Sequence, residues 1–194
     1  MEDEEEIKKK VKINDNNDEN CLLLKKISDL LTDICDENKN EKKLFYKQLK
    51  CFYSKEIPVI SIKDYLEHIY KYTQINSSTL VLILIYIDRI CNICNCKISY
   101  YNIHKIILGS ILIAIKYNED ECFSLKYYAK IGGVSLSEIL ILEYNFISLI
   151  NFNLYVSNDL FHKYNDYILS SDSDDDYDYD DIDDNNNIIN EIDE

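Results

Sequence analysis

Residues 80–87 read LVLILIYI, and only a tyrosine hydroxyl interrupts the apolar character of this run. Either Ser77 or Ser78 can act as the N-cap of a helix here, because a serine hydroxyl accepts a hydrogen bond from the backbone N–H groups of the first turn. A helix that is apolar on all sides is buried by other elements. We therefore expect residues 80–87 to lie in the central helix of the fold.

Glycine and proline are rare in this chain, with three Gly and one Pro among 194 residues. Multi-stranded β folds need turn residues at roughly every 8–12 positions. Phosphate-binding loops need several closely spaced glycines. The sequence has neither pattern, which excludes these classes and predicts an all-α fold.

Apolar residues recur at helical spacing on both sides of the central segment and predict further helices. Ser61 and Ser135 are suitable N-caps, and Ser135 forms a capping box with Glu138. Gly132-Gly133 is a stop signal for the helix before it. The expected helices cover about residues 21–35, 41–53, 62–69, 101–117, 124–131, 136–150 and 158–169.

Composition divides the chain into a helical domain and its flanks. Residues 1–20 are charged and rich in asparagine, so we expect them to be disordered. Residues 21–55 are a helical extension, and Pro58 marks the boundary that follows because proline interrupts helices. The domain covers 56–169, and residues 170–194 are an Asp- and Asn-rich tail that should be disordered and self-repelling.

The formal net charge of −15 belongs mostly to this tail, because residues 172–194 carry 12 acidic side chains and no basic one. The remainder is nearly neutral and no region has a basic excess. A protein that grips nucleic acid by neutralising phosphates needs such an excess. We therefore expect no nucleic-acid partner.

Seven cysteines occur in a chain whose N-terminus is acidic and has no apolar signal region. This combination indicates a reducing compartment. No apolar run approaches the roughly 20 residues that span a bilayer. We expect a soluble intracellular protein, in the nucleus or the cytoplasm, without a membrane partner.

Glu143 lies on the apolar side expected for helix 136–150. At about 100° per residue it falls about 20° from Leu136, on the same side as Ile139, Leu140, Ile147 and Ile150. A carboxylate there is costly unless it is paired. The partner can be a cation of the same chain or a group of another chain, and the pattern leaves both alternatives open.

Lys116 is the candidate counter-charge within the chain. It shares one stripe of helix 101–117 with Lys105 and Gly109, and the glycine would let another backbone approach closely. The alternative for Lys116 is an ordinary solvated lysine.

Arg89 is the only arginine among 21 basic residues. A guanidinium retained where lysine is the usual base suggests planar bonding with several donors. Its neighbour Asp88 lies on the central helix and also needs a partner. We expect both residues to support the fold rather than to carry out chemistry.

Cys91, Cys94 and Cys96 form a compact cysteine cluster. A structural zinc site needs four ligands, usually from two pairs, and His104 is the only imidazole nearby. We favour small apolar side chains at a helix end and keep a metal or redox role as the alternative. The three histidines have no neighbouring Ser or Cys nucleophile motif, so we predict no catalytic residue, no metal and no cofactor.

Several short motifs taken together resemble a cyclin box, over about residues 56–167. Their order and the GGVSL segment at 132–136 are similar to those of the P/U-type cyclins, which are related to the phosphate-regulating cyclins. The motifs are IPVISI-x-DYL from Ile57, YIDR from Tyr86, NIHK from Asn102, AIKY from Ala114, YYAKIGG from Tyr127, Leu142-Glu143 and Phe152-Asn153-Leu154.

The resemblance implies a five-helix cyclin fold with a single cyclin box, in a regulatory subunit that binds and activates a cyclin-dependent kinase. In cyclins a lysine and a glutamate at these positions bond to kinase backbone near its C-helix, so the roles carry over to Lys116 and Glu143. Tyr117 replaces a frequent phenylalanine, and Ile147 adds apolar contact. The expected assembly is a kinase heterodimer and otherwise a monomer, and a cyclin-fold adaptor without a kinase remains the alternative.

The resemblance also suggests an internal polar pair. In cyclins the aspartate at position 88 pairs with an arginine of the first box helix, and His68 stands at the matching position here. We therefore expect a His68–Asp88 pair. In the tail, Ser171 and Ser173 each have Asp three residues later and are candidate phosphorylation sites for an acid-directed kinase.

Overall fold

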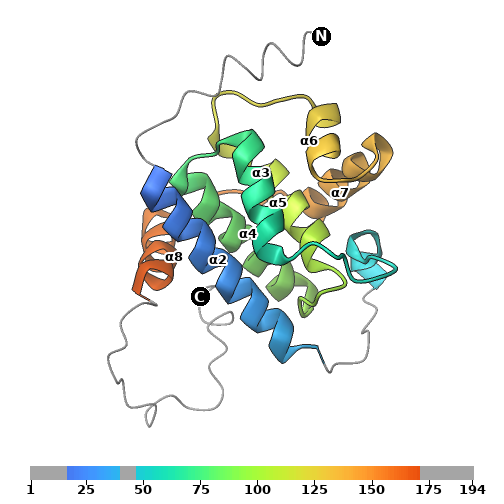
Figure 1. Cartoon of the computed structure of the whole chain (residues 1–194), viewed down its shortest axis with the longest axis horizontal. Helices are drawn as coiled ribbons and strands as arrows, with labels where there is room; N and C mark the ends of the chain where they lie inside the picture. Colours follow the sequence, from blue (N-terminus) through green and yellow to red (C-terminus); the bar gives the residue numbers. More distant parts are fainter. Residues whose placement is uncertain (1–16, 40–46, 171–194) are drawn as a thin grey trace.

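The computed structural model describes residues 17–39 and 47–170. These residues form seven α-helices and one 3₁₀ helix and contain no strand, which confirms the all-α prediction. Figure 1 shows α4 (Ser77–Cys94) and α5 (Ile103–Asn118) in the middle of the molecule. Most of the predicted disorder, at 1–16 and 171–194, and the serines at 171 and 173 lie outside the described residues. Residues 17–20 and Ser170, also predicted to be disordered, are helical in α2 and α8.

The other helices surround α4 and α5 (Figure 1). Helix α5 packs against α4 and α7, and α2 packs against α3, α4 and α8, while α6 lies on α7. Their bounds are α2 (Asn17–Glu37), η1 (Lys47–Phe52), α3 (Ile62–Thr73), α6 (Leu125–Ile131), α7 (Leu136–Leu149) and α8 (Asn158–Ser170).

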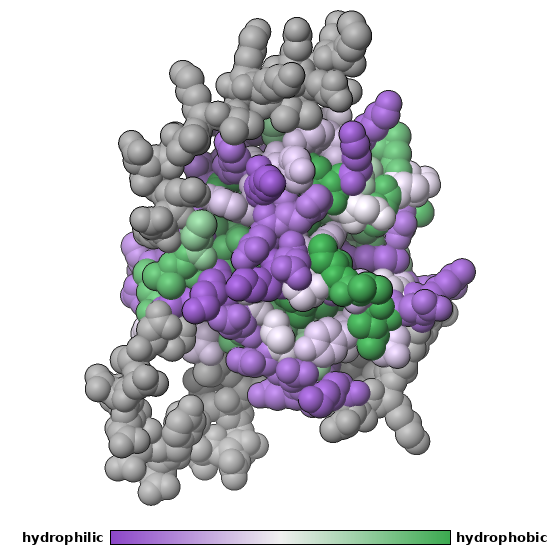
Figure 2. Space-filling model, in the orientation of Figure 1, coloured by the Kyte–Doolittle hydropathy of each residue, from purple (hydrophilic) through white to green (hydrophobic). Residues whose placement is uncertain are grey.

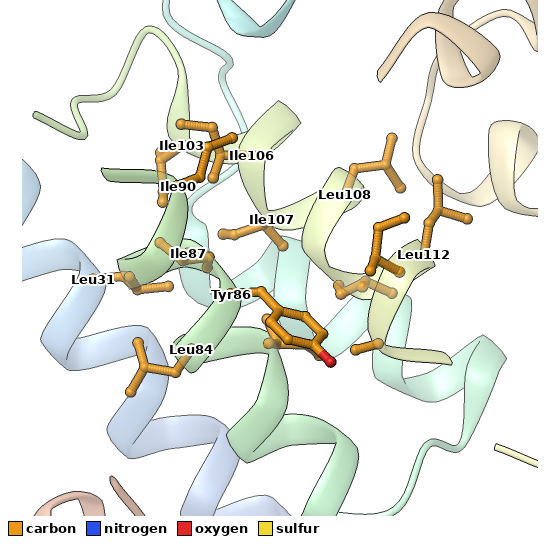
Figure 3. Close-up of a cluster of buried hydrophobic side chains, with 14 of the residues drawn as sticks. Leu31, Leu84, Tyr86, Ile87, Ile90, Ile103, Ile106, Ile107, Leu108 and Leu112 are labelled. Carbon is orange, nitrogen blue, oxygen red and sulfur yellow. The ribbon is translucent and has the colours of Figure 1, made fainter. Parts of the chain in front are cut away.

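Helix α4 is the central helix, as the apolar run predicted. By length and composition alone it could cross a membrane, yet 72% of its residues are buried inside the domain, as in a core helix. Figure 3 shows side chains of α2, α4 and α5 meeting in one cluster, with Ile87 and Ile90 of α4 near Ile103 and Ile107 of α5. The ring of Tyr86 fills the middle of this cluster.

Local capping signals set several helix starts. The hydroxyl groups of Ser61, Ser124 and Ser135 each accept a hydrogen bond from the backbone N–H three residues later. Only half of the predicted capping box forms, because Glu138 instead makes an ion pair with Lys105 at 2.8 Å. This ion pair ties the start of α7 to the start of α5.

The predicted N-cap of α4 is wrong. Asn76 occupies the cap position, and its side chain makes no capping hydrogen bond. The carboxylate of Glu119, just after α5, accepts hydrogen bonds from the Asn76 backbone N–H and from the Thr79 hydroxyl instead. Ser77 is the first residue of the helix rather than its cap.

The N-terminal helices belong to the same hydrophobic core as the rest. Helix α2 begins at Asn17, earlier than the predicted start at residue 21, and it buries Leu23, Ile27 and Leu31. Lys26 donates a hydrogen bond to the carbonyl of Leu169 in α8 at 2.7 Å. Of the helix expected at 41–53, the described part is the 3₁₀ helix η1.

Candidate functional site

The contact between α5 and α7 depends on Gly109. A methyl group at this position would lie 2.8 Å from Phe146 Cδ2 and 3.3 Å from Phe52 Cε1, which is too close for an ordinary contact. The sequence suggested a close backbone at Gly109, whereas the structure places the Phe146 ring there. Phe146 is fully buried, and its edge packs against the Phe52 ring with centroids 6.0 Å apart.

This close packing brings Lys116, at the end of α5, to Glu143 in α7. The Lys116 ammonium group donates to Glu143 Oε1, and the two form an ion pair. The exposed fractions of the two side chains are 37% and 19%, so both still reach the surface. Of the alternatives that the sequence left open for Glu143, the structure shows a cation of the same chain as its partner.

The apolar side of α7 is turned relative to the predicted one. The buried side chains are those of Ile139, Leu142 and Phe146, followed by Ile150 after the helix. Their common direction lies about 80° around the helix from Leu136. Glu143 therefore stands at the border of the core rather than in the middle of the buried face.

Of the stripe predicted to be core, Ile139 and Ile150 are fully buried, and the rest reaches the surface. Leu136 and Leu140 are 46% and 47% exposed, and Ile147 is half-buried beside them. Figure 2 shows hydrophobic residues on the surface over α7. The ion pair of Lys116 and Glu143 is thus bordered by apolar side chains that have no cover within the described chain.

Tyr117 extends this surface towards the segment that follows α7. Its side chain is 48% exposed. Burial raises the pKa of Tyr86, and the nearby Tyr117 hydroxyl raises it further. The Tyr86 hydroxyl in turn donates to the carbonyl of Leu154 at 2.9 Å. Tyr117 and the Leu154 carbonyl therefore both lie near Tyr86.

Two aromatic side chains of that segment project from the surface: Phe152 is 68% and Tyr155 is 71% exposed. Asn151 and Phe152 have φ angles of 53° and 57°, in the left-handed region that bulky residues rarely adopt. A hydrogen bond of 2.9 Å from the Phe152 N–H to the carbonyl of Ile147 fixes this turn. Backbone in such conformations is frequent at functional sites.

Sequence reasoning did not identify Phe152 or Tyr155 as surface residues. Phe152 belongs to the last of the cyclin-box motifs, and an apolar aromatic side chain is ordinarily expected in a core. The exposure follows from the left-handed turn, for which the sequence carries only the weak signal of Asn151, a residue type that tolerates this conformation.

The buried Arg89 binds the backbone of the segment at residues 152–155. Its guanidinium donates to the carbonyls of Asn153 at 2.6 Å and Tyr155 at 3.3 Å, and the residue is 8% exposed. It also lies 5.8 Å from the centre of the Tyr86 ring. The guanidinium therefore uses several donors at once, and its bonds fix the exposed aromatic segment to α4.

The structure does not bring His68 and Asp88 together. The Asp88 carboxylate accepts hydrogen bonds from the Tyr164 hydroxyl of α8 and from Asn92 at 3.2 Å. His68 is exposed, and its ring packs edge-on against Tyr72 with centroids 5.0 Å apart. In place of the predicted histidine, Asp88 has Tyr164 as its partner, a residue of α8 that is distant in sequence.

The cysteine cluster lies at the end of α4. Cys91, Cys94 and Cys96 are all buried and are free thiols. Within residues 17–39 and 47–170, no three Cys, His, Asp or Glu side chains are grouped as a metal site would need. The metal alternative for this cluster therefore gains no support from its surroundings.

A model of the Cyclin family matches residues 8–154 of the chain, a region that includes α2. The chain is similar to Cyclin-U2-1 of Arabidopsis thaliana, with 37% identity over 120 residues, 61% of this chain and 54% of the relative. Cyclin-U4-2 of the same plant is 33% identical over 74% of this chain and 67% of its own length. Cyclin-P4-1 of Oryza sativa subsp. japonica is 35% identical over 55% of this chain and 51% of the relative.

The matched part of the chain spans about half the length of several of these relatives. The family match nevertheless covers most of the chain, and all of these relatives are cyclins of the U or P type. The helices α3 to α7 are the five that the sequence resemblance assigned to the cyclin box. The chain therefore belongs to the cyclin family, as a cyclin of the P/U type.

Proposed function

We propose that this chain is the regulatory subunit of a cyclin-dependent protein kinase, which it binds and activates inside the cell. Cyclins are regulatory rather than catalytic proteins. The observation that carries the proposal is the ion pair of Lys116 and Glu143, which reaches the surface among exposed apolar side chains. Exposed apolar side chains beside polar or charged groups mark interaction sites for other proteins.

The kinase-binding surface in this proposal has a charged centre and two apolar borders. Lys116 and Glu143 bond to backbone groups of the kinase near its C-helix. Ile147 and Tyr117 provide apolar contact on either side. Phe152 and Tyr155 extend the surface, and aromatic side chains of this kind often carry much of the binding energy of an interface.

Activation follows from preferential binding to one state of the kinase. A kinase exchanges between states with its C-helix displaced or turned inward, and a partner that binds the inward state more tightly shifts the population towards it. The inward helix completes the lysine–glutamate pair that the phosphate transfer requires. The cyclin takes no part in the chemical step.

The experiment that tests this proposal is recovery of the partner from cells. The tagged full-length chain is expected to retain a protein kinase, identified by mass spectrometry, and added chain should raise the activity of that purified kinase. Glu143→Ala should weaken the interaction by roughly 2–5 kcal/mol, because it leaves a desolvated group unpaired in the interface.

Glu138→Ala is the matched control, since it breaks the other ion pair between α5 and α7 and lies outside the proposed surface. It should retain the kinase as the unmodified chain does. Recovery of a non-kinase partner alone, retained equally well by both variants, would favour the adaptor role and contradict the proposal.

A further inference from the structure

The end of α4 brings two cysteines together through its backbone. Asn95 has a φ of 44°, and its N–H donates to the carbonyl of Asn92 at 3.1 Å. The N–H of Cys96 donates to the carbonyl of Cys91 at 3.0 Å. These two bonds define a Schellman ending, in which the side chain after the left-handed residue packs against the one five positions earlier. In this chain both of those side chains are thiols.

The two thiols interact directly. The hydrogen bond between Cys91 and Cys96 lowers the pKa of Cys96 and, together with burial, raises the pKa of Cys91 well above its usual value. The Cys96 thiol also donates to the carbonyl of Ile90 at 4.0 Å. Burial raises the pKa of Cys94 to about 11. Cys96 is therefore the most readily ionised thiol of the cluster, and Cys91 is its immediate neighbour.

Access to the pair is narrow, because Cys91 and Cys96 are each 8% exposed. A bulky disulfide reagent could reach them only after the helix end opens. A molecule about the size of water can reach the two thiols through a much smaller opening than a disulfide reagent needs. Hydrogen peroxide meets this condition and oxidises thiolates.

We propose that Cys91 and Cys96 are a peroxide-sensitive thiol pair that forms a reversible disulfide. The Cys96 thiolate attacks one oxygen of hydrogen peroxide, the O–O bond breaks, and Cys96 sulfenic acid forms as the departing hydroxide takes a proton and leaves as water. The Cys91 sulfur then attacks the Cys96 sulfur, the S–O bond breaks, and a second water leaves with the Cys91 proton. The pair loses two electrons to the peroxide, and a dithiol reductant restores both thiols.

Mass spectrometry of the full-length protein tests this pairing. Trypsin cuts after Arg89 and Lys97, so one peptide, 90–97, contains all three cysteines of the cluster. After peroxide treatment, iodoacetamide and digestion, this peptide should have lost two hydrogens and should carry its alkyl group on Cys94 alone. Dithiothreitol before alkylation should return it to the fully alkylated form.

Three comparisons make the result specific. The same treatment in urea should no longer confine the link to Cys91 and Cys96, because the Schellman geometry is gone. Cys94→Ser should still form the link, whereas Cys96→Ser should not. A fully alkylated 90–97 peptide under conditions that oxidise the exposed Cys21 and Cys122, or a link to Cys94 in the folded protein, would overturn the proposal.

Discussion

His104 is a buried histidine whose ring joins α5 to the segment before α3. Its Nε2–H donates to the carbonyl of Ile60 at 2.9 Å, and its ring packs edge-on against Tyr65 with centroids 5.1 Å apart. Its Nδ1 is buried and has no hydrogen-bond partner among the residues that the structure describes. Burial lowers the pKa of His104 from its ordinary value of 6.5, so the folded protein keeps the ring neutral.

Acidification should therefore weaken the fold through this residue. As the pH falls, the unfolded chain takes up the proton at His104 before the folded chain does. The free energy of unfolding has its full value above the unfolded pKa of 6.5 and declines as the pH drops through it towards the lower folded pKa. Urea denaturation at a series of pH values between about 7.5 and 5.5 measures this decline.

His104→Gln should remove most of the fall in the free energy of unfolding at low pH. The glutamine amide can donate to the Ile60 carbonyl and does not titrate. His68→Gln is the matched control at an exposed position, and it should keep the pH dependence of the unmodified protein. A His104→Gln variant that loses stability with acid as steeply as the unmodified protein would show that this ring is not responsible.

At the scale of single elements, the end of α5 caps the start of α4. Glu119 Oε1 accepts from the Asn76 N–H at 2.9 Å and from the Thr79 hydroxyl, and Oε2 accepts from Asn76 Nδ2 at 2.8 Å. Asn118 adds hydrogen bonds to Ser78 and Thr79. A carboxylate at the N-terminus of a helix also interacts favourably with the helix dipole.

Glu119→Ala should lower the free energy of unfolding by about 1–2 kcal/mol, the usual effect of losing a helix cap. Asp120→Ala removes the neighbouring, exposed carboxylate and should change stability by less than about 0.5 kcal/mol. Chemical denaturation of the two variants side by side provides the measurement. Equal stability of the two would contradict the capping role of Glu119.

These elements show what local sequence can predict. The caps at Ser61 and Ser135 were predictable because each serine hydroxyl and the backbone N–H that it accepts from are only three residues apart in the sequence. The cap of α4 was not, because its acceptor, Glu119, comes from the far end of another helix. The same applies to Tyr164, which reaches Asp88 from α8.

The candidate site was predictable in part for the same reason. Lys116 and Glu143 stood out as charges that needed partners on adjacent helices, and the structure pairs them. The buried side of α7 was misplaced because apolar residues occupy more than half of the helix surface, so hydropathy alone cannot choose among them. The choice is made by the space above Gly109, which admits Phe146 and thereby turns Leu136 and Leu140 outward.

At the scale of the whole molecule, charge and binding surface are separate. Residues 172–194 carry 12 acidic side chains and no base, so their removal changes the formal net charge from −15 to −3. The proposed kinase-binding surface lies within α5, α7 and residues 152–155. Deletion of 172–194 should therefore leave kinase affinity and activation unchanged, as measured by titration calorimetry and a kinase assay. A change in affinity of more than about tenfold would mean that the tail belongs to the interface.

Helices α5 and α7 are joined by two ion pairs, and this duplication allows the central claim to be tested without disturbing the fold. Lys116 pairs with Glu143 on the proposed surface, and Lys105 pairs with Glu138 away from it. Exchanging the two charges of a pair keeps the attraction within the chain but reverses the charge that each position offers to a partner. Stability should therefore change by less than about 1 kcal/mol in the Lys116 and Glu143 exchange. The Lys105 and Glu138 exchange also removes the donation from Lys105 Nζ to the Tyr53 carbonyl at 3.4 Å.

The decisive measurement is the affinity of the recovered kinase for these two exchanged variants. Lys116→Glu combined with Glu143→Lys should weaken binding by about 2–5 kcal/mol, roughly 30-fold to several thousand-fold. Lys105→Glu combined with Glu138→Lys should bind within about threefold of the unmodified chain. Unchanged affinity in the first variant, or an equal loss in both, would contradict the kinase-binding role of Lys116 and Glu143.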